Sequence, residues 1–580
     1  MNNLQVADVF TNIADLLEIK GENIYKILAY RKAAESLNSL AQDVNEVWRD
    51  GKLKDVPGIG KAISDKIDEL LSTGKLGFFE KLKQEVPISL VELLHVPDVG
   101  PKKVALFWHS LGITDVAGLE AAAKAGQLRT LPGMGEKSEA KILNGIEALH
   151  KRSGRIPIGR AWVEAQALLD YLHGVPAISR VELAGSLRRM RSTIGDLDLV
   201  AASTDPAVAM AAFKNYPQVI QVMGGGEAKT SVELYRGLRV QLWVQPPERF
   251  GTLWQYATGS KEHNVRLREL ALDKGYSLSE QHMARADGSE LLCASEEEVY
   301  AAIGLPYIPP ELREDRGEIE AARSGRLPNL ITLPDIQAEL HCHTTWSDGS
   351  YSIREMAEAA MVRGIKVLAI TDHSHGLGIT HGLSPDDLRQ QKLEIDQVQK
   401  EVGDRLVLLQ GAEVEIHTDG SLEFSDEVLA ILDVVIASVH TGLRQPREQV
   451  TGRLLNAVRN PHVDIIGHPL GGLIGEREPA DVDMDALMAA AAESGTALEI
   501  NADPSRLDLN DIYARRAIEL GIPLSLNRDA HSIETLGQDE FGVATARRGW
   551  VEPRHVINAW PVQALLDWLR NPSGRLNTHK

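Results

Sequence analysis

The chain has 580 residues, 43% of them hydrophobic, and its 62 Lys and Arg against 82 Asp and Glu give a formal net charge of −20. A chain of this length exceeds a single hydrophobic core, so we expect several domains. The sequence shows no secretory signal and no apolar stretch of the roughly 18 residues that span a membrane. Two cysteines are too few for a disulfide framework. We therefore expect a cytoplasmic protein without membrane contact.

The acidic balance argues at first against a nucleic-acid partner, because phosphate binding usually requires a basic surface. However, residues 1–160 contain 22 Lys and Arg against 21 Asp and Glu. The acidic excess lies downstream, where cation-binding sites or a solvated acidic surface would explain it.

The pattern of apolar residues divides the chain into three parts. Residues 1–150 show helical spacing with short Gly-rich interruptions, which predicts an all-helical part. From about 155, short alternating runs between helical stretches predict an α+β part. The Pro- and charge-rich stretch 304–335 predicts a connector on the surface. From 336 onward, strands alternate regularly with helices, which predicts a parallel sheet with its chemistry at the C-terminal strand ends.

Three segments of the helical part share one layout: "LKDVPGIGKAISDKI" (53–67), "LLHVPDVGPKKVALF" (93–107) and "LRTLPGMGEKSEAKIL" (128–143). In each, a glycine turn presents backbone N–H groups at a helix N-terminus, where they and the following lysines suit a phosphate. Three copies favour binding of a DNA backbone. The candidate DNA contacts are Gly58, Gly60, Gly100, Lys102, Lys103, Gly133 and Gly135.

These turns resemble helix-hairpin-helix motifs arranged as in family X DNA polymerases. In that family the N-terminal helical domain binds a 5′-phosphate and can carry a lyase lysine, and residues 58–76 are similar to that segment. Lys66 falls at the lyase position. The local sequence cannot show the lowered pKa that a Schiff-base lysine needs, so a solvated helix lysine remains the alternative.

The run "TIGDLDLVAAS" (193–203) contains two carboxylates among apolar residues. Because positions two apart in a strand share a face, Asp196 and Asp198 would repel each other unless a cation lay between them. Residues 184–200 resemble the palm of family X polymerases, in which Gly-Ser and an Arg hold the triphosphate and two aspartates hold Mg²⁺ or Mn²⁺. The residues at matching positions are Gly185, Ser186, Arg189, Asp196 and Asp198, and, in a nucleotide-binding segment (256–276), Tyr256, Gly259, Ser260, Asn264 and Arg268.

The third carboxylate of that family's palm is missing. In "LRVQLWV" (238–244), Gln241 stands at the position of the Asp, Trp243 at that of an Arg, and Ala257 at that of an aromatic residue. An amide carries no negative charge and cannot accept a proton at neutral pH, so we expect weak polymerisation. Alternatively, Glu233 or Glu227 supplies the missing carboxylate.

Histidines are concentrated in the C-terminal part, where eleven of the 18 lie between residues 341 and 555. Several stand beside carboxylates at the ends of predicted strands, so they can converge on two or three cations. The candidate metal ligands are His341, His343, Asp348, His373, Glu413, His440, His468, Asp529 and His531.

This part resembles the polymerase and histidinol phosphatase (PHP) domain over nearly all of residues 336–575, which implies a distorted (β/α)7 barrel with three metal ions. By that resemblance, one ion takes His341, His343 and Asp529, a second His440 and His468 with Glu413 as a bridge, and a third Asp348, His373 and His531. The resemblance favours Mn²⁺, and the ligand types also suit Zn²⁺ or Fe²⁺. Such ions activate water for hydrolysis of phosphodiesters or phosphomonoesters. His375, His381 and His417 are either outer contacts or loop histidines that face water.

We therefore predict a monomeric DNA repair enzyme with Mn²⁺-dependent 3′-5′ exonuclease activity. Its polymerase core is expected to bind gapped, nicked or 3′-ended DNA. If the palm is active, it also binds deoxynucleoside triphosphates. The alternatives are a gap-filling polymerase of base excision repair and a non-catalytic DNA-end-binding scaffold. The predicted fold is an all-α helix-hairpin-helix part, an α+β palm and thumb, and a PHP barrel. The predicted boundaries are 1–90 (end-binding), 91–150 (fingers), 151–245 (palm), 246–320 (thumb), 321–335 (linker) and 336–580 (PHP).

Overall fold

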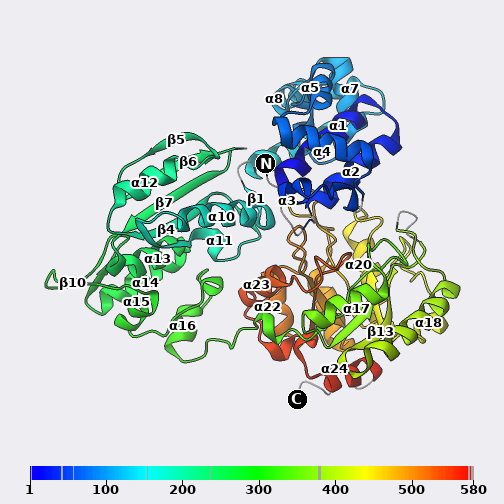
Figure 1. Ribbon diagram of the computed structural model, residues 1–580. Helices are drawn as coiled ribbons and strands as arrows, with labels where there is room; N and C mark the ends of the chain where they lie inside the picture. Colours follow the sequence, from blue (N-terminus) through cyan, green and yellow to red (C-terminus); the bar gives the residue numbers. More distant parts are fainter. Residues whose placement is uncertain are drawn as a thin grey trace. The chain divides into compact units, whose positions relative to one another are not determined.

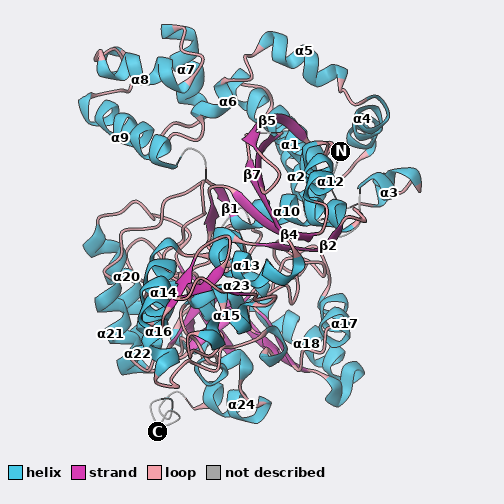
Figure 2. Cartoon of the chain, turned by 90° about the vertical axis from the view of Figure 1, so that its left-hand side faces the viewer, coloured by secondary structure: helices cyan, strands magenta, loops and turns pink. Residues whose placement is uncertain are grey.

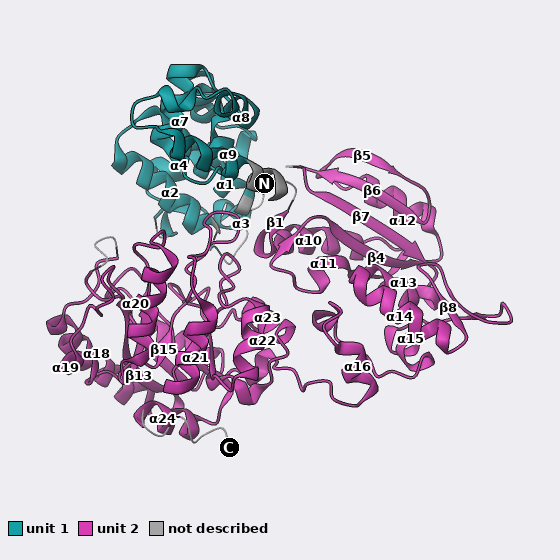
Figure 3. Cartoon of the chain, turned by 180° about the vertical axis from the view of Figure 1, so that it is seen from behind, with its two compact units in different colours: residues 1–153 teal, residues 154–580 magenta. Residues whose placement is uncertain are grey.

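The computed structural model describes residues 1, 3–38, 40, 44–56, 58–152, 155–235, 237–376, 380–571 and 575. The chain divides into two units, residues 1–153 and 154–580, which are coloured separately in Figure 3. We describe each unit by itself. Among the described residues, no helix is long and apolar enough to cross a membrane.

The described part of the first unit is built from helices, which confirms the predicted all-helical fold. The helices are α1 (Asn3–Lys20), α2 (Ile24–Asn38), α3 (Val44–Arg49), α4 (Lys61–Thr73), α5 (Gly77–Glu85), α6 (Leu90–Leu93), α7 (Pro101–Leu111), α8 (Val116–Lys124) and α9 (Glu136–Arg152), with the short 3-10 helices η1 (Leu53–Asp55) and η2 (Leu128–Thr130). Helical spacing of apolar residues builds the core. In α4, for example, Ile63, Ile67 and Leu70 are buried on one face of the helix.

The N-terminal part of the second unit contains a sheet of five described strands in the order β2-β4-β7-β6-β5. Figure 1 labels β4, β5, β6 and β7 of this sheet. The strands are β2 (Ile178–Leu183), β4 (Leu197–Ser203), β5 (Val219–Gly225), β6 (Lys229–Leu234) and β7 (Arg239–Gln245). In β4, Leu197 and Leu199 are buried in a core shared with helices α10 (Ile158–His173) and α12 (Pro206–Lys214). Because strand side chains alternate, Asp196 and Asp198 lie on the other face.

A helical region follows the sheet. It contains α13 (Phe250–Thr258), α14 (Lys261–Asp273), α15 (Glu296–Ala302) and α16 (Glu318–Arg323), with a small antiparallel sheet of β8 (Tyr276–Leu278), β9 (Met283–Arg285) and β10 (Glu290–Leu291). Its core includes Leu267, Tyr300 and Ile308.

The C-terminal region is a nearly closed parallel barrel, which confirms the predicted (β/α)7 fold. Its described strands lie in sequence order: β11 (Ala338–Glu339), β12 (Val367–Ile370), β13 (Val407–Glu415), β14 (Val434–Ser438), β15 (Ile465–Ile466), β16 (Ala497–Asn501) and β17 (Leu524–Asn527). A parallel bridge between Cys342 and Ala530 brings the ends of β11 and β17 together.

Helices surround the strands of the barrel. In Figure 2 all helices are cyan and all strands are magenta. The described ones are α17 (Ile353–Val362), α18 (Pro385–Val402), α19 (Asp426–Leu429), α20 (Arg447–Arg459), α21 (Met484–Ser494), α22 (Asp511–Glu519), α23 (Glu540–Arg548) and α24 (Val562–Arg570).

The prediction that 304–335 is a surface connector is wrong for much of that stretch. Arg313 and Glu318 are fully buried, and Ile331 is buried in the barrel core. The charges are compatible with burial because each has a partner. Arg313 donates a 2.6 Å hydrogen bond to Glu296, and Glu318 lies 2.6 Å from Nδ1 of His263. Composition alone cannot show such pairing.

The pair of Arg313 and Glu296 yields a stability prediction. Burial raises the pKa of Glu296, but the charge of Arg313 and the hydrogen bonds from Arg188 and Arg313 lower it to about 2. Glu296→Ala leaves the buried guanidinium without its carboxylate, and we expect a loss of about 3–5 kcal/mol. Hydrogen exchange of residues 296–322 should show faster opening. Glu297→Ala, the same change at an exposed neighbour, should leave that exchange nearly unaltered, and equal effects would contradict the prediction.

Candidate functional site

The nine candidate metal ligands lie at the C-terminal ends of the barrel strands. His341 and His343 follow β11, His373 follows β12, and Glu413 belongs to β13. His440 follows β14, His468 follows β15, and Asp529 and His531 follow β17, while Asp348 lies in the loop after β11. The barrel topology therefore brings together residues that are up to 190 positions apart in the sequence.

Glu413 is the centre of this group. Its carboxylate is almost fully buried, and its two oxygens lie between 2.9 and 3.5 Å from imidazole nitrogens of His341, His343, His373, His440 and His468. Burial raises the pKa of Glu413, but the positive charges of His440, His341 and His373 outweigh it and hold the pKa well below the ordinary value. One carboxylate thus lies close to five imidazoles from four other barrel segments.

The side chains form three overlapping sets whose ligand atoms lie within 4.8 Å of one another. The sets are His343, Asp348, His373 and His531; His341, His343 and Asp529; and His373, Glu413 and His440. His343 and His373 each belong to two sets, so the geometry joins groups that the family resemblance assigns to separate ions.

The donor atoms fit metal cations. Several are buried without a hydrogen-bond partner among the described residues, namely Nε2 of His341, both ring nitrogens of His343, Oε2 of Glu413 and Oδ1 of Asp529. Buried polar atoms are normally paired, so a cluster of unpaired ones facing each other needs an explanation. Cations held by imidazole and carboxylate ligands provide one.

Two further carboxylates orient the imidazoles. Glu499 lies 2.7 Å from Nδ1 of His341, and Glu415 lies 2.8 Å from Nδ1 of His440. A proton held at Nδ1 leaves the Nε2 lone pair directed toward Glu413. The sequence interpretation missed both residues. Glu415 had a signal, because it stands two positions after Glu413 in one buried strand.

In the palm sheet, Asp198 lies against Gly185. A Cβ atom at Gly185 would be 2.1 Å from Oδ2 of Asp198, and φ of Gly185 is +59°, so this position requires glycine. Burial and the nearby charge of Asp196 raise the pKa of Asp198 to about 7. Two carboxylates in this arrangement are stabilised by a divalent cation.

Gln241 lies beside the two aspartates. Its Cα pairs with that of Asp198 across the parallel strands β4 and β7, and its amide Nε2 donates a 2.9 Å hydrogen bond to Oδ2 of Asp196. The amide therefore presents a donor, not a negative charge, to the carboxylate pair. Lys229, which the sequence interpretation missed, lies 3.8 Å from the ring centre of Trp243, and its charge lowers the pKa of Asp198.

The candidate nucleotide-binding residues have the following contacts. Arg189 donates hydrogen bonds to Oε1 of Glu314 at 3.1 Å and to the carbonyl of Thr258. Its Nη1 would be 3.0 Å from a Cβ atom at Gly259. Asn264 donates to the carbonyl of Tyr256 at 2.8 Å. Ser186 is half-buried in α11 (Gly185–Arg188), Ser260 caps α14, and Arg268 is exposed on α14.

Comparisons with known proteins identify the family. Residues 1–76 match a helix-hairpin-helix domain, 90–148 a SAM-like helix-hairpin-helix tandem, 253–314 the DNA polymerase beta thumb, and 339–503 the PHP domain. The DNA polymerase/3′-5′ exonuclease PolX of Bacillus subtilis (strain 168) is 39% identical over 562 residues, which cover 96% of this chain and 98% of that protein. The chain belongs to the family X DNA polymerases that carry a PHP domain.

Over part of its length, this family X polymerase is also similar to smaller proteins. A probable phosphatase of Thermoanaerobacter sp. (strain X514) is 29% identical over 232 residues, 38% of this chain and 89% of that protein. A probable phosphatase of Caldanaerobacter subterraneus subsp. tengcongensis is 32% identical over 226 residues, 37% of this chain and 82% of that protein.

The three glycine turns of the polymerase share one backbone shape. Gly58, Asp98 and Gly133 take positive φ angles of 81°, 64° and 73°, and the N–H of the next residue in each turn donates a 3.0 Å bond to the carbonyl three residues earlier. The turns end in helices at Gly60, Gly100 and Gly135. Lys102 is exposed, whereas Lys103 donates to the carbonyl of Asp98 at 2.7 Å. Nζ of Lys66 lies 3.3 Å from the carbonyl of Ala62 and 5.5 Å from the ring centre of Phe78.

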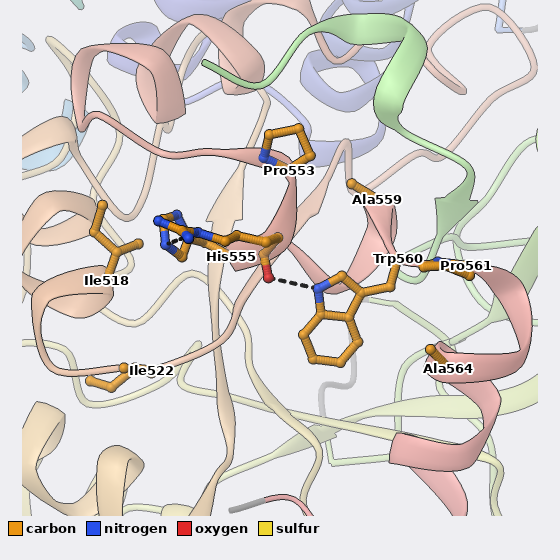
Figure 4. A pocket seen from close by; sticks show the side chains of 10 residues that line it. Ile518, Ile522, Pro553, His555, Ala559, Trp560, Pro561 and Ala564 are labelled. Atoms are coloured by element: carbon orange, nitrogen blue, oxygen red, sulfur yellow. Dashed lines mark hydrogen bonds between the residues drawn. The ribbon is translucent and has the colours of Figure 1, made fainter. Parts of the chain in front are cut away.

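Other candidates lie outside the nine-residue group. His375 and His417 lie 2.9 and 3.0 Å from the two oxygens of Glu423. A pocket of about 770 Å³ lies beside Ile522, just before the N-terminal end of β17, and His555 and Trp560 line it (Figure 4). Asp529 follows the opposite end of that strand, so this pocket is separate from the metal-ligand candidates.

Proton release on metal binding provides a test of the centre. Burial lowers the pKa of His440, but Glu413 and Glu415 outweigh it and raise the pKa to about 9. Below that pH a cation must displace the proton, so apparent affinity for Mn²⁺ should rise between pH 7 and 9, by up to about tenfold per unit for each proton displaced. Calorimetric titration of the metal-free polymerase in buffers of different ionisation enthalpy measures this release. An affinity independent of pH would contradict the prediction.

Proposed function

We propose that this polymerase degrades DNA from its 3′ end in the PHP domain with bound Mn²⁺, and that its polymerase core binds gapped or nicked DNA but transfers nucleotides poorly. The observation that carries the proposal is the contrast between two sites. In the barrel, all nine candidate ligands converge around Glu413. In the palm, an amide donates to Asp196 where a third carboxylate is needed.

The nuclease proposal assigns each side chain a task. The nine candidate residues hold the metal ions, which supply an activated water and stabilise the departing 3′-oxygen when they are bound. Glu415 and Glu499 hold protons at Nδ1 of His440 and His341 and so keep the Nε2 atoms available as ligands. Buried barrel walls keep these imidazoles in place.

The palm proposal follows from Gln241. Its Nε2–H engages Oδ2 of Asp196 and adds no negative charge, so the site holds cations with two carboxylates and lacks a group that draws the proton from a primer hydroxyl. Glu233 lies on the neighbouring strand β6, on the same face of the sheet as Gln241. In the pairing of β6 with β7, however, it stands opposite Arg239, two residues before Gln241. This register supports Gln241, not Glu233, as the residue nearest the aspartates.

For DNA binding, we propose that the three glycine turns contact backbone phosphates through N–H groups at their helix N-termini, with Lys102 and Lys103 adding charge. The same shape in all three turns supports this proposal. Lys66, at the lyase position of the family, is proposed to act at a 5′-phosphate end. Arg189 and Gly259 are proposed to hold a triphosphate, for which Glu314 must release Arg189.

The nuclease proposal predicts that His343→Ala or Glu413→Gln lowers 3′-5′ degradation of a 5′-labelled oligonucleotide at least 100-fold with Mn²⁺, because each removes a ligand from the shared centre. His462→Ala, elsewhere in the barrel, serves as the control. Degradation that survives both ligand substitutions would overturn the proposal. Chelation that abolishes degradation without unfolding the chain separates this role from a purely structural one.

The palm proposal predicts that Gln241→Asp increases primer extension on gapped DNA by at least tenfold, since it restores a third carboxylate. Adding Asp198→Asn to Gln241→Asp should remove the gain, which shows that extension uses the palm metals. Equal extension by the native chain and Gln241→Asp would instead support the alternative, an active gap-filling polymerase.

A further inference from the structure

Three arginines stand on successive loops at the rim of the metal-ligand cluster. Arg444 follows β14, Arg477 follows β15, and Arg506 follows β16. Arg506 is the innermost of them. Its Nε lies 4.0 Å from Oδ2 of Asp529, and its Nη1 is buried without a hydrogen-bond partner among the described residues.

The loops that carry these arginines are fixed against one another. The N–H of Ile474 donates to the carbonyl of Ser505 at 2.6 Å, which ties the Arg477 loop to the Arg506 loop. Arg477 itself donates to the carbonyl of Gly471 at 2.9 Å. A Cβ at Gly471 would lie 2.9 Å from the side chain of Leu443, so the residue before Arg444 contacts the same loop.

The three arginines act on one another electrostatically, and most of the nearby carboxylates have other partners. Burial and the charges of Arg506 and Arg444 lower the pKa of Arg477. The charge of Glu476 raises that pKa, but its effect is the smallest of the four. Arg506 also lowers the pKa of His468. Of the nearby carboxylates, Asp503 pairs with Arg528, Asp508 accepts the N–H groups of Leu470 and Gly471, and Asp529 faces the histidines.

Guanidinium groups held together against their mutual repulsion make a site for anions, and Arg suits phosphate oxygens in particular. The Arg444 and Arg477 loops follow β14 and β15, whose ends carry His440 and His468, and the Arg506 loop follows β16, which lies between β15 and β17. An anion at the rim therefore lies next to an anion at the centre. A polynucleotide supplies two adjacent phosphates, whereas a substrate with a single phosphate group supplies one.

We propose that this arginine rim is the subsite for the strand's backbone, in which Arg506 contacts the scissile phosphate and Arg477 and Arg444 contact the phosphate next to it. The inference rests on the proposed nuclease function and adds its substrate class, a polynucleotide 3′ end with at least two phosphates. The centre accordingly prefers oligonucleotides over substrates with one phosphate.

The test compares two substrates with Mn²⁺ and the full chain: a single-stranded oligonucleotide and bis(p-nitrophenyl) phosphate, which has one phosphodiester. Arg477→Ala and Arg444→Ala should each lower the ratio of kcat/KM for the oligonucleotide to that for the small diester by about tenfold, mainly through KM. The slope of log kcat/KM against log salt for the oligonucleotide should fall by about one per arginine removed. Arg477→Lys should keep the slope.

Arg447→Ala is the matched control, because this exposed arginine begins α20 and faces Asp481 and Asp483. It should leave both the ratio and the slope unchanged. If Arg477→Ala loses its fold, Arg444→Ala still decides, since Arg444 is exposed. A ratio that stays within twofold in the folded rim variants overturns the rim subsite. Degradation that survives His343→Ala instead overturns the nuclease proposal, so the two failures are distinct.

Discussion

One buried carboxylate, Glu413, organises the functional end of the barrel. Five imidazoles from four strand ends lie within 3.5 Å of its oxygens, and an uncompensated charge at this depth would be costly. Histidines compensate this charge, and two of them, His440 and His341, are held at Nδ1 by Glu415 and Glu499. The convergence of these side chains, and with it the capacity for cations, centres on this carboxylate.

The palm lacks an equivalent arrangement. Asp198 lies on β4 and Asp196 directly before it, and Gly185 allows Asp198 to approach closely. Gln241 occupies the third position as a hydrogen-bond donor. Arg189 is engaged by Glu314, which also accepts from Arg548 of α23 at 3.0 Å. The polymerase core thus retains its scaffold while its charge balance differs from that of a three-carboxylate site.

Much of the fold and of the metal-ligand cluster could be predicted from the sequence, because the periodicity of apolar residues and the spacing of polar ones indicate which residues share a face. The helical N-terminal part, the parallel barrel and the candidate ligands at strand ends are of this kind. Pairing between distant residues leaves no local trace, so the buried charges of Arg313 and Glu318 and the support from Glu499 were missed. His343 belongs to two ligand sets. This depends on where the side chains lie in space, which the spacing of residues in the sequence does not determine.

The length of one labelled DNA strand over time tests the proposed function most directly. A gapped duplex with a 5′-labelled primer is incubated with the chain and Mn²⁺, with and without deoxynucleoside triphosphates, and the primer length is measured. We predict stepwise shortening under both conditions, because in the proposed function the barrel centre degrades the strand and the palm transfers nucleotides poorly. Extension with nucleotides and no shortening without them would contradict it.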